Sequence, residues 1–68
     1  MNLQNIIATR SFQTIGGQPL APRIVGDQVI LDDPRTEQMF DWMSAEDFAY
    51  VVSVGTLEES GTLLTITW

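Results

Sequence analysis

The stretch AYVVSVGTLEESGTLLTITW, residues 49–68, carries the strongest strand pattern in the chain. Residues 49–57 and 62–68 are rich in β-branched and aromatic side chains, and the residues between them favour a turn. This pattern predicts a β-hairpin. A three-residue loop, Glu59-Ser60-Gly61, matches apolar residues along one face of that hairpin.

Trp68 is the last residue of this predicted hairpin, and the three-residue loop places it opposite Val52. An inward position there would make Trp68 a core residue. The alternative that stays open is an indole exposed for a partner.

A second hairpin is predicted in PRIVGDQVIL, residues 22–31. Gly26 and Asp27 form its two-residue turn, because glycine suits the positive φ at the first central position of a type II′ turn. Ile24 then pairs with Val29, which places both side chains on one face of the hairpin.

Residues 33–43 predict a helix, with Asp33 as its N-cap and Pro34 in its first position. Four side chains have helical spacing and would form its buried stripe: Thr36, Met39, Phe40 and Met43. The sequence SAED, residues 44–47, is a second capping signal. It can open either a short turn before the next strand or a helix that continues to Val54, and the β-branched run VVSV favours the turn.

The N-terminal third predicts one strand over residues 5–15. A loop over residues 16–22 follows, because Pro19 and Pro22 cannot donate hydrogen bonds to a sheet. The resulting order is βββαββ. We expect one α+β domain over residues 1–68, with about five short antiparallel strands and one helix packed on the sheet. A partly open barrel is one form that such a sheet can take.

The residue types that are absent limit the chemistry. The 68 residues include no Cys, His or Lys, which removes the thiol, imidazole and amine groups of most enzymes and the usual ligands of zinc. We therefore expect a non-enzymatic protein with no metal and no cofactor. A core this small, without disulfides, also predicts support from a second copy, most simply in a dimer.

Charge limits the partners. Nine Asp and Glu against three Arg give a formal net charge of −6. Phosphate backbones are bound through cations, so direct nucleic-acid binding is not expected. No apolar run approaches the roughly 20 residues of a membrane span, and the first residues lack the pattern of a secretion signal. These features predict a protein of the cytoplasm, of a cell or of an infected host, that is steered toward basic surfaces.

Seven of the nine carboxylates lie between residues 27 and 47, interleaved with aromatic side chains. We expect the acidic face of the predicted helix, bordered by those aromatic residues, to dock on a basic surface of a larger protein. The predicted partner-binding residues are Glu37, Asp41, Trp42, Asp33 and Glu46.

Small acidic phage-encoded inhibitors, including anti-CRISPR and DNA-mimic proteins, are similar to this chain in size and charge. An inhibitor of that type is therefore the leading functional hypothesis, although no motif assigns the chain to any one family of them. The alternative is a structural subunit of a virion or of another homo-oligomeric assembly, held together through sheet edges.

Overall fold

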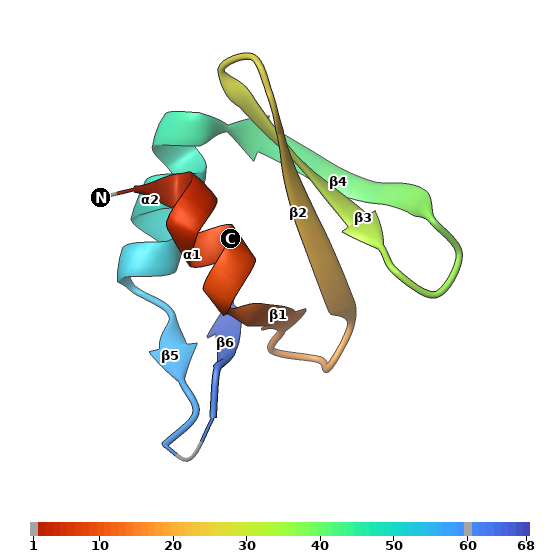
Figure 1. Cartoon of the computed structure of the whole chain (residues 1–68). Helices are drawn as coiled ribbons and strands as arrows, with labels where there is room; N and C mark the ends of the chain where they lie inside the picture. Colours follow the sequence, from red (N-terminus) through yellow and green to blue (C-terminus); the bar gives the residue numbers. More distant parts are fainter. Residues whose placement is uncertain (1, 60) are drawn as a thin grey trace.

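The computed structural model describes residues 2–59 and 61–68. Within these ranges six strands form one open sheet in the order β4-β3-β2-β1-β6-β5, and two helices pack against it (Figure 1). The elements are α1 (Leu3–Thr9), β1 (Ser11–Thr14), β2 (Pro19–Val25), β3 (Gln28–Asp33), β4 (Gln38–Ser44), α2 (Ala45–Ser53), β5 (Thr56–Leu57) and β6 (Leu63–Ile66). The predicted class, a small β-rich α+β domain with a helix packed on its sheet, is confirmed.

The hairpin of β2 and β3 forms with the predicted register. Ile24 pairs with Val29, and Pro22 pairs with Leu31. Gly26 has a φ of 63°, the left-handed value that the first central position of a type II′ turn requires and that glycine adopts without steric cost.

The two prolines lie in β2 rather than in a loop, because β2 begins at Pro19. β1 is short, and its Cα pairing with β2 reaches only Pro19 and Leu20. In the register of a two-residue hairpin, Pro22 occupies a position whose nitrogen points away from β3. Since β1 does not extend to that position, no ladder hydrogen bond is lost there, and the proline is tolerated.

The helix predicted over residues 33–43 is wrong. Asp33 ends β3, and its carbonyl oxygen accepts the N–H groups of Thr36 at 3.2 Å and of Glu37 at 2.7 Å in the turn. The chain then continues as β4, which pairs with β3 and buries Met43 beside Val29. These residues have helical spacing, but pairing with the neighbouring strand β3 determines their structure.

The strand predicted over residues 49–57 is also wrong, and the helical alternative for this segment is correct: residues Ala45–Ser53 form α2. Its N-cap is Ser44, whose hydroxyl accepts the Asp47 N–H at 3.0 Å. Phe48 and Val51, three residues apart, are buried against the sheet. The cap and this burial offset the low helix propensity of the β-branched run.

The N-terminal segment forms a helix and a strand instead of the single strand predicted over residues 5–15. Asn2 caps α1 by accepting the Asn5 N–H at 3.1 Å, and β1 follows after the extended Arg10. β1 pairs with β6 in parallel, with Phe12 beside Leu64. The expectation of a wholly antiparallel sheet is therefore wrong for this pair.

The C-terminal hairpin is shorter than predicted, and its register differs by one residue. Thr56 pairs with Thr65, and Leu57 pairs with Leu64. The predicted loop includes Ser60, which lies outside the described residues. α2 continues to Ser53 and β5 begins only at Thr56, so Val52 belongs to the helix and does not pair with Trp68.

The core lies between the helices and one face of the sheet. Its buried side chains form one cluster: Phe12, Leu20, Val29, Leu31, Met43, Phe48, Val51, Leu64 and Ile66. In Figure 1 both helices lie to the left of β2, β3 and β4. Neither helix of the described chain has the length and apolar character needed to cross a bilayer.

Candidate partner-binding surface

Trp68 follows β6 and lies at the surface. Its side chain is 50% exposed, so the predicted role as a core residue is wrong. The indole N–H donates to the Asp41 carboxylate at 2.8 Å, and the ring meets Phe40 edge to face with centroids 6.4 Å apart. These two contacts hold the indole in place while leaving half of it accessible.

Asp41 connects the C-terminal residues to β4. Its Oδ2 accepts the Trp68 indole N–H, and its Oδ1 accepts the backbone N–H of Trp42 at 2.8 Å. Asp41 pairs with the buried Leu31, so its side chain lies on the face of the sheet that also carries the core. The sheet is therefore curled enough for the residues after β6 to meet β4 across that face.

Two hollows flank Trp68. One, of about 390 Å³, lies between the turn after β1, β4 and the last three residues of the chain. The other, of about 270 Å³, lies between Trp68 and α2. We call the following exposed or half-buried side chains around them the Trp68 surface: Ile15, Phe40, Asp41, Asp47, Tyr50 and Trp68.

The Trp68 surface combines large apolar side chains with carboxylates. Ile15 is 74% exposed and Tyr50 is 68% exposed, and large apolar side chains that lie together at a surface mark interaction sites in many proteins. Asp41 and Asp47 line the hollows, and no described Arg lines either one. The surface therefore presents apolar contact area together with negative charge.

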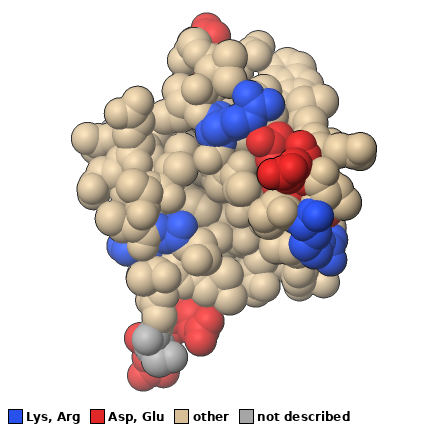
Figure 2. All heavy atoms as spheres, turned by 45° about the vertical axis from the view of Figure 1, so that its right-hand side comes forward, with Lys and Arg blue, Asp and Glu red and all other residues tan. Residues whose placement is uncertain are grey.

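The arginines with ion pairs are held elsewhere. Arg23 meets Asp32 at 2.7 Å, on the face of the sheet opposite to Ile24 and the core. Arg35 meets Asp33 at the end of β3. Figure 2 shows a face on which blue and red side chains lie in contact at the right, with a separate red group at the lower end. The charges of this face form ion pairs and isolated groups, not one acidic ridge.

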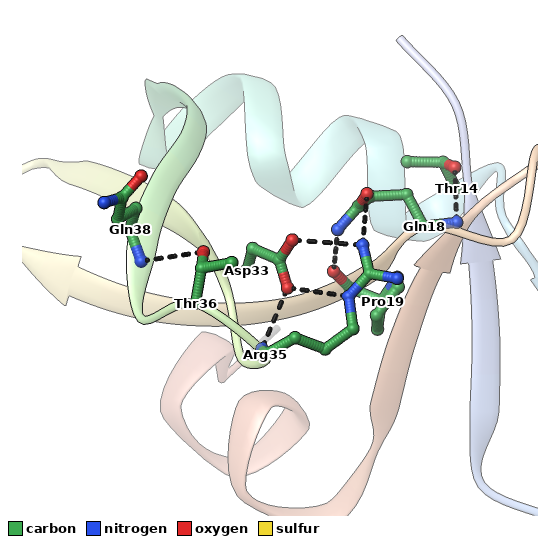
Figure 3. Close-up of polar contacts among 7 residues, drawn as sticks. All are labelled: Thr14, Gln18, Pro19, Asp33, Arg35, Thr36 and Gln38. Carbon is green, nitrogen blue, oxygen red and sulfur yellow. Dashed lines mark hydrogen bonds and ion pairs between the residues drawn. The ribbon is translucent and has the colours of Figure 1, made fainter.

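A polar network surrounds Asp33 and joins two turns (Figure 3). Arg35 donates to both Asp33 oxygens, from Nε and Nη2, each at 3.1 Å, and its Nη2 also reaches Gln18 Oε1 at 2.9 Å. Side-chain hydrogen bonds from Arg35, followed by its backbone N–H, hold the pKa of Asp33 well below its usual range, and the same pair raises the pKa of Arg35.

This shift argues against an acid–base role for Asp33. A general acid needs a carboxyl pKa raised toward neutrality, whereas the pKa of Asp33 moves in the opposite direction. The network instead ties the β3–β4 turn, through Gln18, to the loop that precedes β2. Its evident role is to fix those two turns together.

The structure separates the five residues predicted to bind a partner, because no helix spans them. Asp33 is engaged by Arg35, and Glu37 lies in the β3–β4 turn with a φ of 61°. Asp41 and Trp42 are consecutive in β4 and face opposite sides of the sheet. Glu46 lies in the first turn of α2. Of the five, only Asp41 belongs to the Trp68 surface.

The remaining members of that surface were missed for identifiable reasons. Asp47 and Tyr50 reach the Trp68 surface only because residues 45–53 form a helix. The capping signal SAED in the sequence indicates that helix. Ile15 comes directly after β1, which pairs with β6 in parallel and so brings Ile15 beside the last residues of the chain. Phe40 lies on β4 and meets Trp68 only because the sheet curls. No local sequence pattern reports that curvature.

In the part of the chain that the structure describes, no group of three or more Asp or Glu residues could hold a metal ion. A scan against protein-family models, a search of curated proteins and a search of solved structures found no match.

Proposed function

We propose that the protein is a non-enzymatic interaction module of the cytoplasm that docks on a basic surface of a larger protein. The observation that carries this proposal is the Trp68 surface, where exposed aromatic rings lie beside carboxylates. Aromatic side chains supply most of the energy of many interfaces, and complementary charge raises the association rate and the specificity.

The charge balance favours a basic partner. The net charge is −6, and two of the three arginines are already paired with Asp32 and Asp33. The long-range field is therefore negative, and the arginines in those pairs do little to offset the carboxylates near Trp68. A small acidic inhibitor that covers the basic nucleic-acid-binding surface of its target would work in this way.

The test begins with affinity capture from the native host and identification of the partner by mass spectrometry. Calorimetry with the purified partner should then show binding that weakens about tenfold or more between roughly 0.05 and 0.5 M salt. The double variant Asp41→Asn/Asp47→Asn should lose most of the affinity.

Asp27→Asn/Glu59→Gln is the matched control for that variant. It removes the same number of charges from two exposed positions that line neither hollow beside Trp68, so it should bind nearly as well as the wild type. Equal affinity for wild type and for Asp41→Asn/Asp47→Asn would refute the proposal.

The alternative function, a subunit of a homo-oligomeric assembly, is favoured by a different observation. β4 is a seven-residue strand at one edge of the sheet, and exposed apolar side chains, Val25 and Trp42 among them, lie on β2 and β4. Sedimentation at several salt concentrations separates the two functions. Self-association that holds or tightens in high salt supports the assembly, because apolar contacts do not weaken there.

A further inference from the structure

We propose that the hollow between Trp68 and α2 binds an arginine side chain from an extended basic segment of the partner. This inference rests on the proposed function and goes beyond it by assigning one hollow and one chemical group. The lining residues are Met43, Asp47, Tyr50, Val51, Thr67 and Trp68.

The walls of this hollow suit a planar cation. Trp68 and Tyr50 present aromatic rings at 50% and 68% exposure, and aromatic faces attract guanidinium groups by cation–π interaction. Met43 and Val51 are buried and form an apolar base, along which the aliphatic stem of an arginine can pack.

Asp47 supplies the counter-charge. Its backbone N–H is used by the Ser44 cap, while its carboxylate, in the first turn of α2, is exposed and has no ion pair among the described residues. A guanidinium pairs with a carboxylate through two parallel hydrogen bonds and stacks on aromatic rings at the same time, which an ammonium group does less well. These properties favour arginine over lysine.

The second hollow fits the residue next to that arginine. It is lined by Ile15, Phe40 and Trp68, among others. Its carboxylate, Asp41, already accepts two N–H groups. An apolar side chain suits it better than a second cation. The occupant is therefore a segment in which an arginine is adjacent to an apolar residue.

The chain contains an internal control for this site. Its two tryptophans should give separate indole N–H signals in NMR spectra, and Trp42 pairs with Ile30 on the face of the sheet away from Asp41. A ligand in the hollow beside Trp68 should shift the Trp68 indole signal and the Tyr50 amide signal. It should leave the Trp42 indole signal in place.

The experiment titrates the ¹⁵N-labelled full chain with the peptide acetyl-Gly-Arg-Leu-Arg-Gly-amide. The same peptide with citrulline at both arginine positions keeps the shape and removes the charge. The arginine peptide should shift the Trp68 and Tyr50 signals saturably. The citrulline peptide should bind about three- to tenfold more weakly, as expected for loss of a cation–π contact and an exposed ion pair.

Two single variants separate local contact from net charge. Asp47→Asn removes the ion pair but keeps the aromatic contacts, so it should weaken binding of the arginine peptide by about two- to fivefold. Glu46→Gln removes the same charge one residue away, from a carboxylate that lines neither hollow, and should change binding by less than about twofold.

The outcomes distinguish this inference from the proposed function. The arginine site is overturned if the arginine peptide shifts the Trp42 signal, or if Asp47→Asn and Glu46→Gln weaken its binding equally. Either result would still be consistent with a basic ligand that binds elsewhere. Absence of any saturable shift would overturn the site as well. The proposed function fails only on its own test, when the identified partner binds Asp41→Asn/Asp47→Asn as tightly as wild type.

Discussion

Replacement of Gly55 by alanine should destabilise the protein strongly, although it adds only one methyl group. Gly55 lies between α2 and β5, with the backbone of β6 directly beside it. A Cβ at this position would lie 2.9 Å from the Thr65 carbonyl oxygen, 3.2 Å from Cγ2 of Ile66 and 3.3 Å from Cδ1 of Leu64. The first of these atoms belongs to the backbone, and the other two belong to buried core side chains.

The loss in free energy of unfolding depends on the atoms of β6 that a Cβ at position 55 would displace. Overpacking of a well-packed site costs about 1 to 3 kcal/mol, and a domain of this length has about 3 to 10 kcal/mol of stability in total. Gly55 is not among the glycines with positive φ, so the cost is steric and not a matter of backbone conformation. Gly55→Ala should therefore remove a large fraction of the total stability.

Urea unfolding followed by far-UV circular dichroism measures this loss. With an m-value of about 1 kcal/mol per molar urea for a small domain, the midpoint should fall by about 1 to 3 M. Gly16→Ala is the matched control, because a Cβ there meets only Thr14 Oγ1 at 3.8 Å. Its stability should change by no more than about 1 kcal/mol. Equal midpoints for the two variants would refute the argument that β6 packs closely against Gly55.

Three further predictions concern a polar pair, a cap and an aromatic ring. Arg35 lowers the folded-state pKa of Asp33, so the pair should stabilise the protein above about pH 4, where an unfolded aspartate is ionised, and lose this effect as the pH falls further. The stability of Asp33→Asn, measured by unfolding across that range, should depend less on pH than that of the wild type. An equal dependence on pH would contradict the pairing. Ser44→Ala should cost about 1 kcal/mol in urea unfolding through loss of the α2 cap, and no loss would mean that the cap is not used. Trp68→Ala should cost clearly less than Phe48→Ala, for which about 3 to 5 kcal/mol is expected, since Trp68 is half exposed; equal thermal midpoints would place Trp68 in the core after all.

The parts of the fold that sequence alone predicted correctly are those set by neighbouring residues. Gly26 and Asp27 specify a tight turn, and alternating apolar residues on both sides of it determine the register of β2 and β3. The cap at Ser44 was also visible in the sequence. It was outweighed in the prediction by β-branched residues, whose strand preference yields in the folded chain to the burial of Phe48 and Val51.

The parts that failed depend on partners far away in the chain. The apolar residues of 36–43 have helical spacing, and pairing with β3 is what makes residues 38–44 a strand. The candidate site failed for the same reason. Asp41 was predicted as a binding residue, but its neighbour Trp68 is reached through the curl of the sheet, 27 positions along the chain.

The parallel pair of β1 and β6 has a consequence for the time course of folding. The two strands join segments 52 positions apart, as between Gln13 and Thr65, and β1 also links β6 to the β2–β3–β4 part of the sheet. Closing so long a loop brings an entropic cost before the contacts that repay it can form. Folding should therefore take on the order of milliseconds to seconds, slowly for so short a chain. Until that closure Phe12 and Leu64 remain in water, and in this interval the chain is most prone to aggregate.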